Sequence, residues 1–347
     1  MDADGPMSVP DDWGDNAGAM RRLAPALAIG LLAAARATVL AHGAHAPTPT
    51  FRAVLMEWSF DPLVVLGLVA AGAAYLWAVL AVNRAHPHNR HPRTRTWLFF
   101  AGLAAIGVAL ASPIETYEGS LFSVHMLQHL VLMLLAAPLL LAGGPITLTL
   151  RSSTPDVRRR LLWILHSPVL KAISFPVFTW LLFVAVNWGW HFSTLYNDAL
   201  ENTLLHYFQH ATFLVAALLF WWPITGVDPS PWRMPYPVRL FYLFLALPQN
   251  SFLGVALLSA GEVLYPHYVT NGRPWGPTPL EDQQLGGVLM WVIGDIAFLI
   301  GMVIVIVGWM RHEERRTARL DERLAAERAA RGEEPWTPRV PRGQTGR

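Results

Sequence analysis

Residues 125–141, "HMLQHLVLMLLAAPLLL", form a stretch that is apolar enough to cross a lipid bilayer, yet its first turns carry two histidines and a glutamine. His125 and His129 are four residues apart, which places both imidazoles on one face of a helix. A neutral imidazole in hydrocarbon leaves polar atoms to satisfy, at a cost of roughly 2–7 kcal/mol when they are unpaired. The stretch therefore predicts a membrane helix with one polar face that needs a partner.

The composition of the whole chain agrees with a membrane protein. Of its 347 residues, 53% are hydrophobic and 14% are charged, whereas soluble domains average about 25% charged residues. The chain has no cysteine, which excludes disulfides and thiolate metal sites. Its formal net charge of +2 gives no reason to expect nucleic acid as a partner.

Seven apolar stretches are long enough to cross the hydrocarbon core, which takes about 20 residues of helix. They lie at residues 62–83, 97–112, 121–142, 172–190, 203–222, 239–260 and 287–310. The predicted fold class is therefore all-α. We expect a polytopic bundle of about seven transmembrane helices in the lipid bilayer, within a domain that covers residues 47–310.

The N-terminal part of the chain falls into two segments. Residues 1–19 are acidic and contain no lysine or arginine, so we predict an unstructured lead. Residues 20–46 begin with a pair of arginines, followed by an apolar stretch and small residues, which is the layout of a secretory signal peptide. One hypothesis is that translation starts at Met20 and that the chain is cleaved near Ala41 or Ala46. The alternative is an uncleaved N-terminal helix.

Basic and acidic connections alternate along the membrane domain. The connections after the first, third and fifth spans carry arginines, whereas the others are acidic. Because positively charged loops remain in the cytoplasm, we predict the N-terminus outside and the C-terminus inside. Residues 311–347 mix arginine and glutamate and predict a charged cytoplasmic tail, either a solvated helix or a disordered arm.

This orientation places a second histidine pair at the depth of the first. His206 and His210 occupy the first turns of the fifth span, which enters from the outer side as the third span does. At about 1.5 Å per residue, each pair lies roughly 6–13 Å below its helix start. His191, at the end of the fourth span, and His267, between the sixth and seventh spans, belong to the same side.

The six outer histidines are a candidate metal site, because imidazole binds zinc, copper, iron and nickel. Met126 and Met133 lie on the third span and are possible accessory thioether ligands for Cu(I). Methionine in an apolar helix is more often plain packing. A network of satisfied polar side chains is the other interpretation of the histidines.

Two other classes of protein remain open at this point. Histidines on facing helices are also typical of haem proteins with two axial imidazoles. Three histidines and a carboxylate would hold zinc in an intramembrane hydrolase. Asp295, inside the last span, and Asp282, near its start, are the candidate carboxylates. A hydrogen bond to a neighbouring helix explains Asp295 equally well.

Four motifs, in order along the chain, resemble a known family. They are "HMLQHLVLMLLAAPLLLAGGP" (125–145), "WGWHFSTLYNDALENTLLHYFQHATFLVAALLFWWPI" (188–224), "LYPHY" (264–268) and "DQQLGGVLMWVIGD" (282–295). They are similar to motifs of the polytopic CtaG family of bacterial cytochrome c oxidase assembly factors. The likeness covers roughly residues 55–310, which is nearly all of the membrane part.

The resemblance implies a protein that helps to form active haem–copper oxidase and is not an enzyme. Its implied partners are cytochrome c oxidase subunits, and its implied location is the bacterial inner membrane, which it crosses several times. It implies copper as the cargo, held transiently and passed on as by a metallochaperone, with zinc and haem as alternatives. The matching positions are His125, His129, His191, His206, His210 and His267, with Asp282 and Gln283 in the last motif.

Overall fold

A computed structural model describes residues 48–331 of the chain. Within this range every regular element is a helix, so the all-α prediction is confirmed for the described part. The predicted lead of residues 1–19, the signal-like segment of residues 20–46 and the end of the tail lie outside the described residues.

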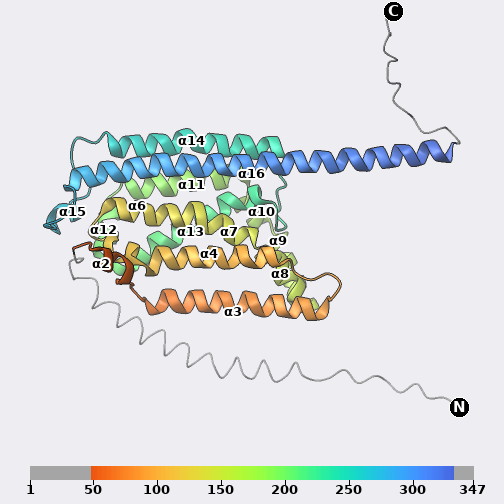
Figure 1. The fold of residues 1–347 in the computed structure, drawn as a ribbon, viewed down its shortest axis with the longest axis horizontal. Coiled ribbons are helices and arrows are strands. Elements are labelled where there is room, and N and C mark those ends of the chain that lie inside the picture. Colours follow the sequence, from red (N-terminus) through yellow and green to blue (C-terminus); the bar gives the residue numbers. More distant parts are fainter. Residues whose placement is uncertain (1–47, 332–347) are drawn as a thin grey trace, which may run out of the picture.

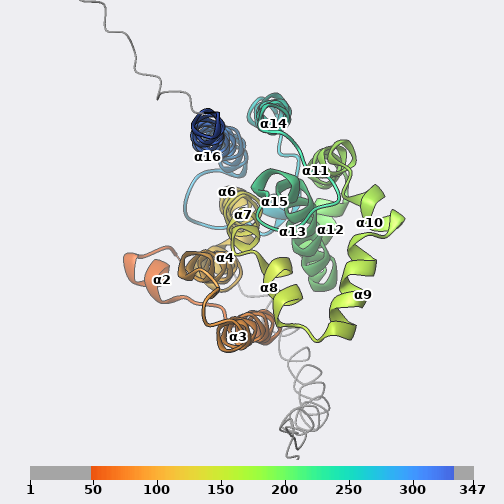
Figure 2. The same ribbon diagram turned by 90° about the vertical axis from the view of Figure 1, so that its right-hand side faces the viewer.

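Six helical segments are long and apolar enough to cross a membrane. They run side by side in a bundle (Figure 1), and α6, α7 and α13 lie at its centre when it is viewed along the helices (Figure 2). The segments are α3 (Pro62–Ala85), α4 (Arg93–Ala111) with α5 (Pro113–Glu118), the run of α6 (Phe122–Leu130), η1 (Val131–Ala136), α7 (Ala137–Ala142) and α8 (Pro145–Ser152), then α13 (Thr203–Thr225), α14 (Tyr236–Leu258) and α16 (Pro279–Ala330).

The predicted fourth span corresponds to α11 (Pro176–His191), which has 16 residues. Such a helix is roughly 24 Å long, whereas the hydrocarbon core is about 30 Å thick. Pro176 lies at the first turn of α11 and not inside it, because the first turn is where a missing backbone N–H costs nothing. The helix packs against α13 and α14 inside the bundle. Six candidate spans are therefore present within residues 48–331, and a seventh crossing stays a prediction.

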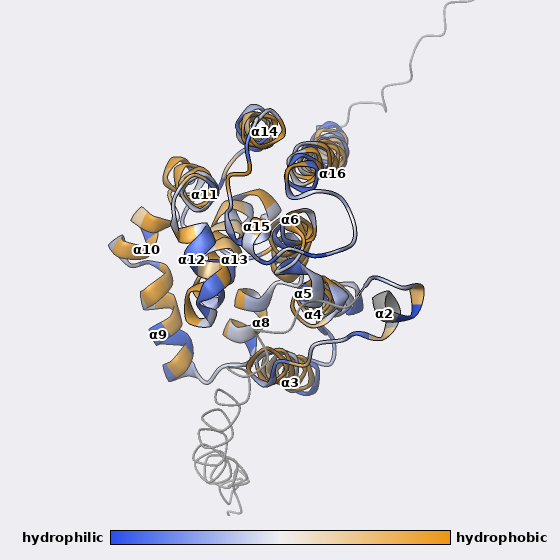
Figure 3. Ribbon diagram, turned by 90° about the vertical axis from the view of Figure 1, so that its left-hand side faces the viewer, coloured by the Kyte–Doolittle hydropathy of each residue, from blue (hydrophilic) through white to orange (hydrophobic). Residues whose placement is uncertain are grey.

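Short helices cover the two ends of the bundle. At one end lie α2 (Phe51–Met56), α12 (Leu195–Glu201) and α15 (His267–Thr270), and at the other lie α9 (Pro155–Leu165) and α10 (Pro168–Ile173) (Figure 1). Large hydrophobic side chains are exposed on the long helices, among them Val69, Trp77, Phe241 and Ile304. Figure 3 shows that hydrophobic residues make up much of these helices. Such a surface fits contact with lipid tails.

The third span contains a π-helix, η1, directly after the residues that carry the histidines. Pro138 follows η1 and has no backbone N–H to donate to the carbonyl four residues earlier. A π-helical turn accommodates one extra residue and is frequent at functional sites. It changes the face on which later residues such as Met133 lie relative to an unbroken α-helix.

Helices α6 and α16 are joined at their first turns. The carboxylate of Asp282 accepts hydrogen bonds from the backbone N–H of Phe122 (2.7 Å) and from the hydroxyl of Ser123 (2.5 Å). A Cβ at Gly286 would clash with the Phe122 ring, so the glycine permits this close approach. Asp282 thus caps the helix that carries His125, and the start of that helix is fixed by a residue 160 positions away.

The chain after residue 310 remains helical within the described part. Helix α16 continues to Ala330 as an extension beyond the bundle (Figure 1), and every side chain from Arg311 to Arg331 is exposed. Of the two forms expected for the tail, the structure contains the solvated helix as far as Ala330.

Candidate metal centre

The two histidine pairs lie on facing helices and converge on one place. His125 and His129 extend from α6, and His206 and His210 extend from the first turns of α13. All four side chains are between 0 and 7% exposed. The ring centres of His125 and His206 are 5.3 Å apart, and those of His129 and His210 are 5.6 Å apart. We call these four residues the histidine cluster.

Two overlapping groups of three residues could each hold a metal ion. In the first, His125, His129 and His210 bring one ring nitrogen each to within 4.8 Å of one another. In the second, Glu118, His125 and His206 bring together two nitrogens and a carboxylate oxygen. All five residues are buried, and His125 belongs to both triads. Imidazole and carboxylate donors at this spacing suit zinc or copper.

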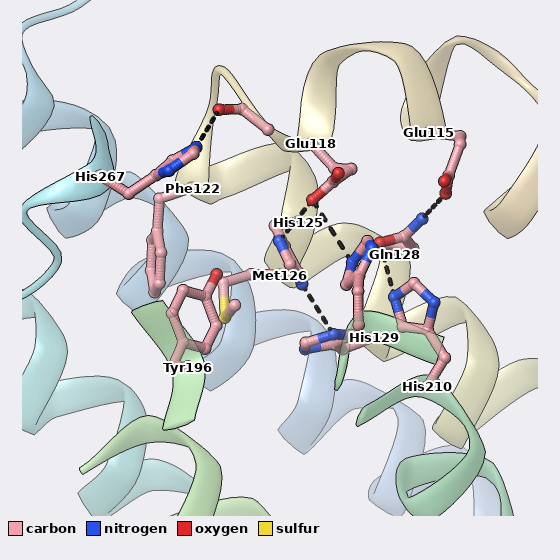
Figure 4. A network of polar contacts seen from close by, with 12 residues as sticks. Glu115, Glu118, Phe122, His125, Met126, Gln128, His129, Tyr196, His210 and His267 are labelled. Atoms are coloured by element: carbon pink, nitrogen blue, oxygen red, sulfur yellow. Dashed lines mark hydrogen bonds and ion pairs between the residues drawn. The ribbon is translucent and has the colours of Figure 1, made fainter. Parts of the chain in front are cut away.

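The contacts inside the cluster assign protons to the histidine rings. Nδ1 of His125 lies 2.7 Å from Oε2 of Glu118, a carboxylate oxygen that only accepts, so Nδ1 carries the proton (Figure 4). This leaves Nε2 of His125 as a lone pair, and it lies 3.0 Å from Nε2 of His129. Nε2 of His129 therefore donates to this lone pair, across a gap that also has the size of a ligand-to-ligand spacing.

Gln128 orients His210 from the neighbouring turn of α6. Its amide N–H groups donate to the carbonyl of Ala109 (2.9 Å) and to Oε2 of Glu115 (2.6 Å), so its amide oxygen faces Nε2 of His210 at 3.1 Å (Figure 4). Nε2 then carries the proton and Nδ1 is the ligand atom. Gln209, in contrast, has no hydrogen-bond partner among the described residues and orients no imidazole.

The two glutamates of this site, Glu115 and Glu118, are not among the residues predicted from sequence. The short helix α5 brings both close to α6. Glu118 contacts His125 and lies 3.6 Å from Nε2 of His206. The available signal was the position of both carboxylates, within ten residues of the first histidine.

His191 and His267 lie beside the cluster but belong to neither triad. Nδ1 of His191 donates to the carbonyl of Asn187 at 2.7 Å, and its Nε2 lies 3.2 Å from the sulfur of Met126. Nε2 of His267 contacts the carbonyl of Gly119 at 3.1 Å. The structure thus brings four of the six predicted histidines into triads and places the other two around them.

Tyr268, in the motif "LYPHY", lies next to His125 and Glu118. Its hydroxyl donates to the carbonyl of Glu118 (3.1 Å) and lies 3.4 Å from Nδ1 of His125. Burial raises the pKa of Tyr268, with the nearby Glu118 charge acting in the same direction. The hydroxyl therefore stays protonated and remains a donor at neutral pH.

The other predicted accessory residues have their own packing partners. Asp282 caps α6 and lies 3.6 Å from the guanidinium of Arg273. Asp295 accepts hydrogen bonds from Asn250 (3.0 Å) and Ser251 (2.7 Å) on α14, which is the helix-to-helix bond considered from sequence. Met126 is fully buried next to His191, and Met133 is buried in the core below it.

The fold and this site define a class: an all-helical multi-pass membrane protein with a buried histidine–carboxylate cluster at one end of its bundle. More closely, the chain belongs to the family of cytochrome c oxidase caa3 assembly factors (Caa3_CtaG), whose model matches residues 73–312. The family predicted from the four motifs is therefore confirmed.

The chain is also similar to mycobacterial proteins described as uncharacterized. It is 33% identical over 281 residues to proteins of Mycobacterium bovis and Mycobacterium tuberculosis, which covers 79% of this chain and 42% of each relative. It is 31% identical over 272 residues to a protein of Mycobacterium leprae, covering 76% and 41%. The chain thus spans less than half the length of these relatives. No solved structure matches it.

Proposed function

We propose that this protein assists the assembly of a cytochrome c oxidase by binding copper at the two triads and passing it to an oxidase subunit, without a catalytic step of its own. The observation that carries the proposal is the pair of buried triads that share His125. The assembly role comes from the family, and the copper role rests on the donor atoms of this chain.

The donor set favours copper over haem. Among N- and O-donor sites, Cu²⁺ has the highest affinity of the first-row divalent metals, ahead of zinc. The cavity next to the cluster measures about 20 Å³, whereas pockets for ligands of drug size or larger have roughly 300–1,000 Å³. A porphyrin does not fit between rings that already lie 5.3 Å apart. The alternative is a zinc-dependent hydrolase in which Glu118, and not Asp282 or Asp295, is the general base. The test must distinguish this alternative from copper binding.

The shared ligand suits transfer and not permanent storage. One ion in either triad occupies His125, so the other triad is then incomplete. Two unit charges about 4 Å apart also repel each other by about 4 kcal/mol at an effective dielectric constant of 20. A second ion that arrives at one triad therefore weakens the hold of the other.

We infer that α11 makes a seventh crossing and that the cluster faces the outer side of a bacterial inner membrane. The opposite end of the bundle holds the basic residues, in agreement with a cytoplasmic location. The arginines of α9 and of the α16 extension lie at that end, namely Arg158, Arg159, Arg160, Arg311, Arg315 and Arg316. Copper would then be delivered to the outer copper centre of the oxidase.

The test is the metal content of the protein purified without chelators. We expect copper in the wild type and its loss in the His129→Ala, His210→Ala double variant, which dismantles the first triad. His166→Ala, an exposed histidine at the basic end, is the matched control and should retain the copper. Equal copper in the wild type and the double variant would overturn the proposal, as would stoichiometric zinc or a Soret band.

The assembly role has its own test in cells. A strain that lacks the protein should contain oxidase with reduced activity and copper content under limiting copper, while oxidase transcripts persist. Fully metallated oxidase in that strain would contradict the proposal whatever the purified protein binds.

A further inference from the structure

Resting on the proposed copper function, we propose that a second site, selective for Cu(I), lies directly below the histidine cluster and is formed by Met126, His191 and His129. These residues line a cavity of about 20 Å³ together with Met133, Met290 and Asn187. A cavity needs roughly 10–15 Å³ to hold a water molecule. This one therefore has room for a single ion or water and for no organic ligand.

The contact between His191 and Met126 provides two ligand atoms for this second site. The carbonyl of Asn187 can only accept, so the 2.7 Å contact places the proton of His191 on Nδ1. Nε2 is then a bare lone pair, and it faces the thioether sulfur of Met126 at 3.2 Å. Neither atom has a proton to donate to the other. Two ligands that each lie about 2.0–2.3 Å from one ion are separated by roughly 3–4 Å, which is the spacing observed.

Nδ1 of His129 provides a third ligand atom. Glu118 fixes the proton of His125 on Nδ1, so the 3.0 Å contact between the two Nε2 atoms requires His129 to donate from Nε2. Nδ1 of His129 is then a second bare lone pair. It is buried and has no hydrogen-bond partner among the described residues. A buried polar atom of this kind is normally satisfied, and an ion in the adjoining cavity would satisfy it.

The thioether and imidazole donors that line the cavity favour Cu(I). Thioethers select Cu(I) among biological metals, and two imidazoles with one thioether form a neutral, low-coordinate ligand set. No carboxylate is found among the residues that line the cavity. A singly charged ion is less costly to place there than a doubly charged one, since the penalty for taking an ion out of water rises with its charge. The histidine cluster above, with Glu118, has the donors that harder ions prefer.

His129 connects the two sites. Its Nε2 faces His125 in the first triad, while Nδ1 is the nitrogen assigned to the cavity, and Figure 4 shows Met126 beside the cluster. A neutral imidazole has a single lone pair, so His129 can serve one of the two sites at a time, by a change of tautomer. Copper that enters the triads as Cu(I) has a neighbouring site of softer donors within reach of the same ring.

The test uses Ag(I) as a redox-inert substitute for Cu(I), and Zn(II) as the harder ion, with the full-length protein in detergent. Met126→Leu keeps the side-chain volume and removes the sulfur. Met302→Leu changes a partly buried methionine that does not line the cavity and is the matched control. We expect Met126→Leu to lose about one equivalent of Ag(I) while its zinc stoichiometry is unchanged, and the control to bind as the wild type.

X-ray absorption of the Cu(I)-loaded wild type gives a measurement that does not depend on any variant. We expect scattering from sulfur and nitrogen at ligand distance, and only nitrogen or oxygen would overturn the inference. Unchanged Ag(I) stoichiometry in Met126→Leu would overturn it as well, since the cavity would then be packing or a water site.

A second pair of variants separates this inference from the proposed function. His125→Ala with His206→Ala dismantles both triads but leaves the three ligands of the cavity. If this double variant keeps about one equivalent of Ag(I) that Met126→Leu removes, the cavity site exists on its own. If the double variant still binds all the copper of the wild type, the triads fail as copper sites. If only the triad variants lower metal binding, the cavity site fails alone.

Discussion

Two of the groups of polar side chains inside this bundle differ in how their atoms are paired. On the interface of α14 and α16, both carboxylate oxygens of Asp295 accept hydrogen bonds, from Asn250 and from Ser251. In the histidine cluster, nitrogen faces nitrogen and Nδ1 of His129 has no partner within residues 48–331. A fully paired network holds helices together, whereas a buried nitrogen without a partner indicates a place where something binds.

Of the substitutions that test this difference, we expect the largest effect at Gln128, on the affinity for copper. Gln128→Leu removes the oxygen that orients His210, and loss of such an outer partner weakens metal binding by about 10–100-fold. Copper affinity, measured by competition with a chelator of known affinity, checks this. Gln209→Leu is the matched control, because Gln209 is equally buried but has no hydrogen-bond partner among the described residues. Equal losses in both variants would show that only packing is being measured.

A change at Asp295 tests the other side of the comparison. Asp295→Asn replaces an acceptor of two hydrogen bonds by a group with one acceptor and one donor, opposite Asn250 and Ser251. We expect the free energy of unfolding to fall by about 1–3 kcal/mol, seen as a lower melting temperature in detergent. Copper stoichiometry should be unchanged. Lost copper with unchanged stability would reverse the roles assigned to the two groups.

The smallest effect is expected at Tyr268. Tyr268→Phe removes a hydroxyl that donates to the carbonyl of Glu118, and a single hydrogen bond contributes about 1 kcal/mol. Because burial raises the pKa of Tyr268, the hydroxyl is protonated throughout the neutral range. The difference in melting temperature between the two proteins should therefore be constant between about pH 6 and pH 9. A difference that disappears as pH rises across that range would contradict the assigned protonation.

Much of the membrane architecture was predictable from sequence because lipid imposes simple rules. Apolar runs mark helices, and the predicted third span of 121–142 and fifth span of 203–222 differ from α6–α7 and α13 by a few residues at most. The common depth of the two histidine pairs followed from spacing and from the direction in which each span enters, whereas their convergence on one place is seen only in the structure. Both inferences use only local periodicity and charge.

What the sequence did not reveal depends on contacts between distant residues or on irregular backbone. Glu118 joins the cluster because α5 turns the chain, and Asp282 caps α6 from 160 residues away. The π-helix η1 leaves no trace in hydropathy. Helix α11 is shorter than its apolar run because Pro176 starts a new helix there. Long-range capping and local turns have no periodic signature.

Helix α16 is a single continuous helix that connects the start of α6 with the exposed extension beyond the bundle. Its 52 residues extend over roughly 78 Å, and no proline interrupts it after the first turn. At one end, the carboxylate of Asp282 caps the first turn of α6. At the other end, α16 extends beyond the bundle and its side chains are exposed. A displacement of the exposed end of α16 would therefore also displace the first turn of α6, the helix that carries His125.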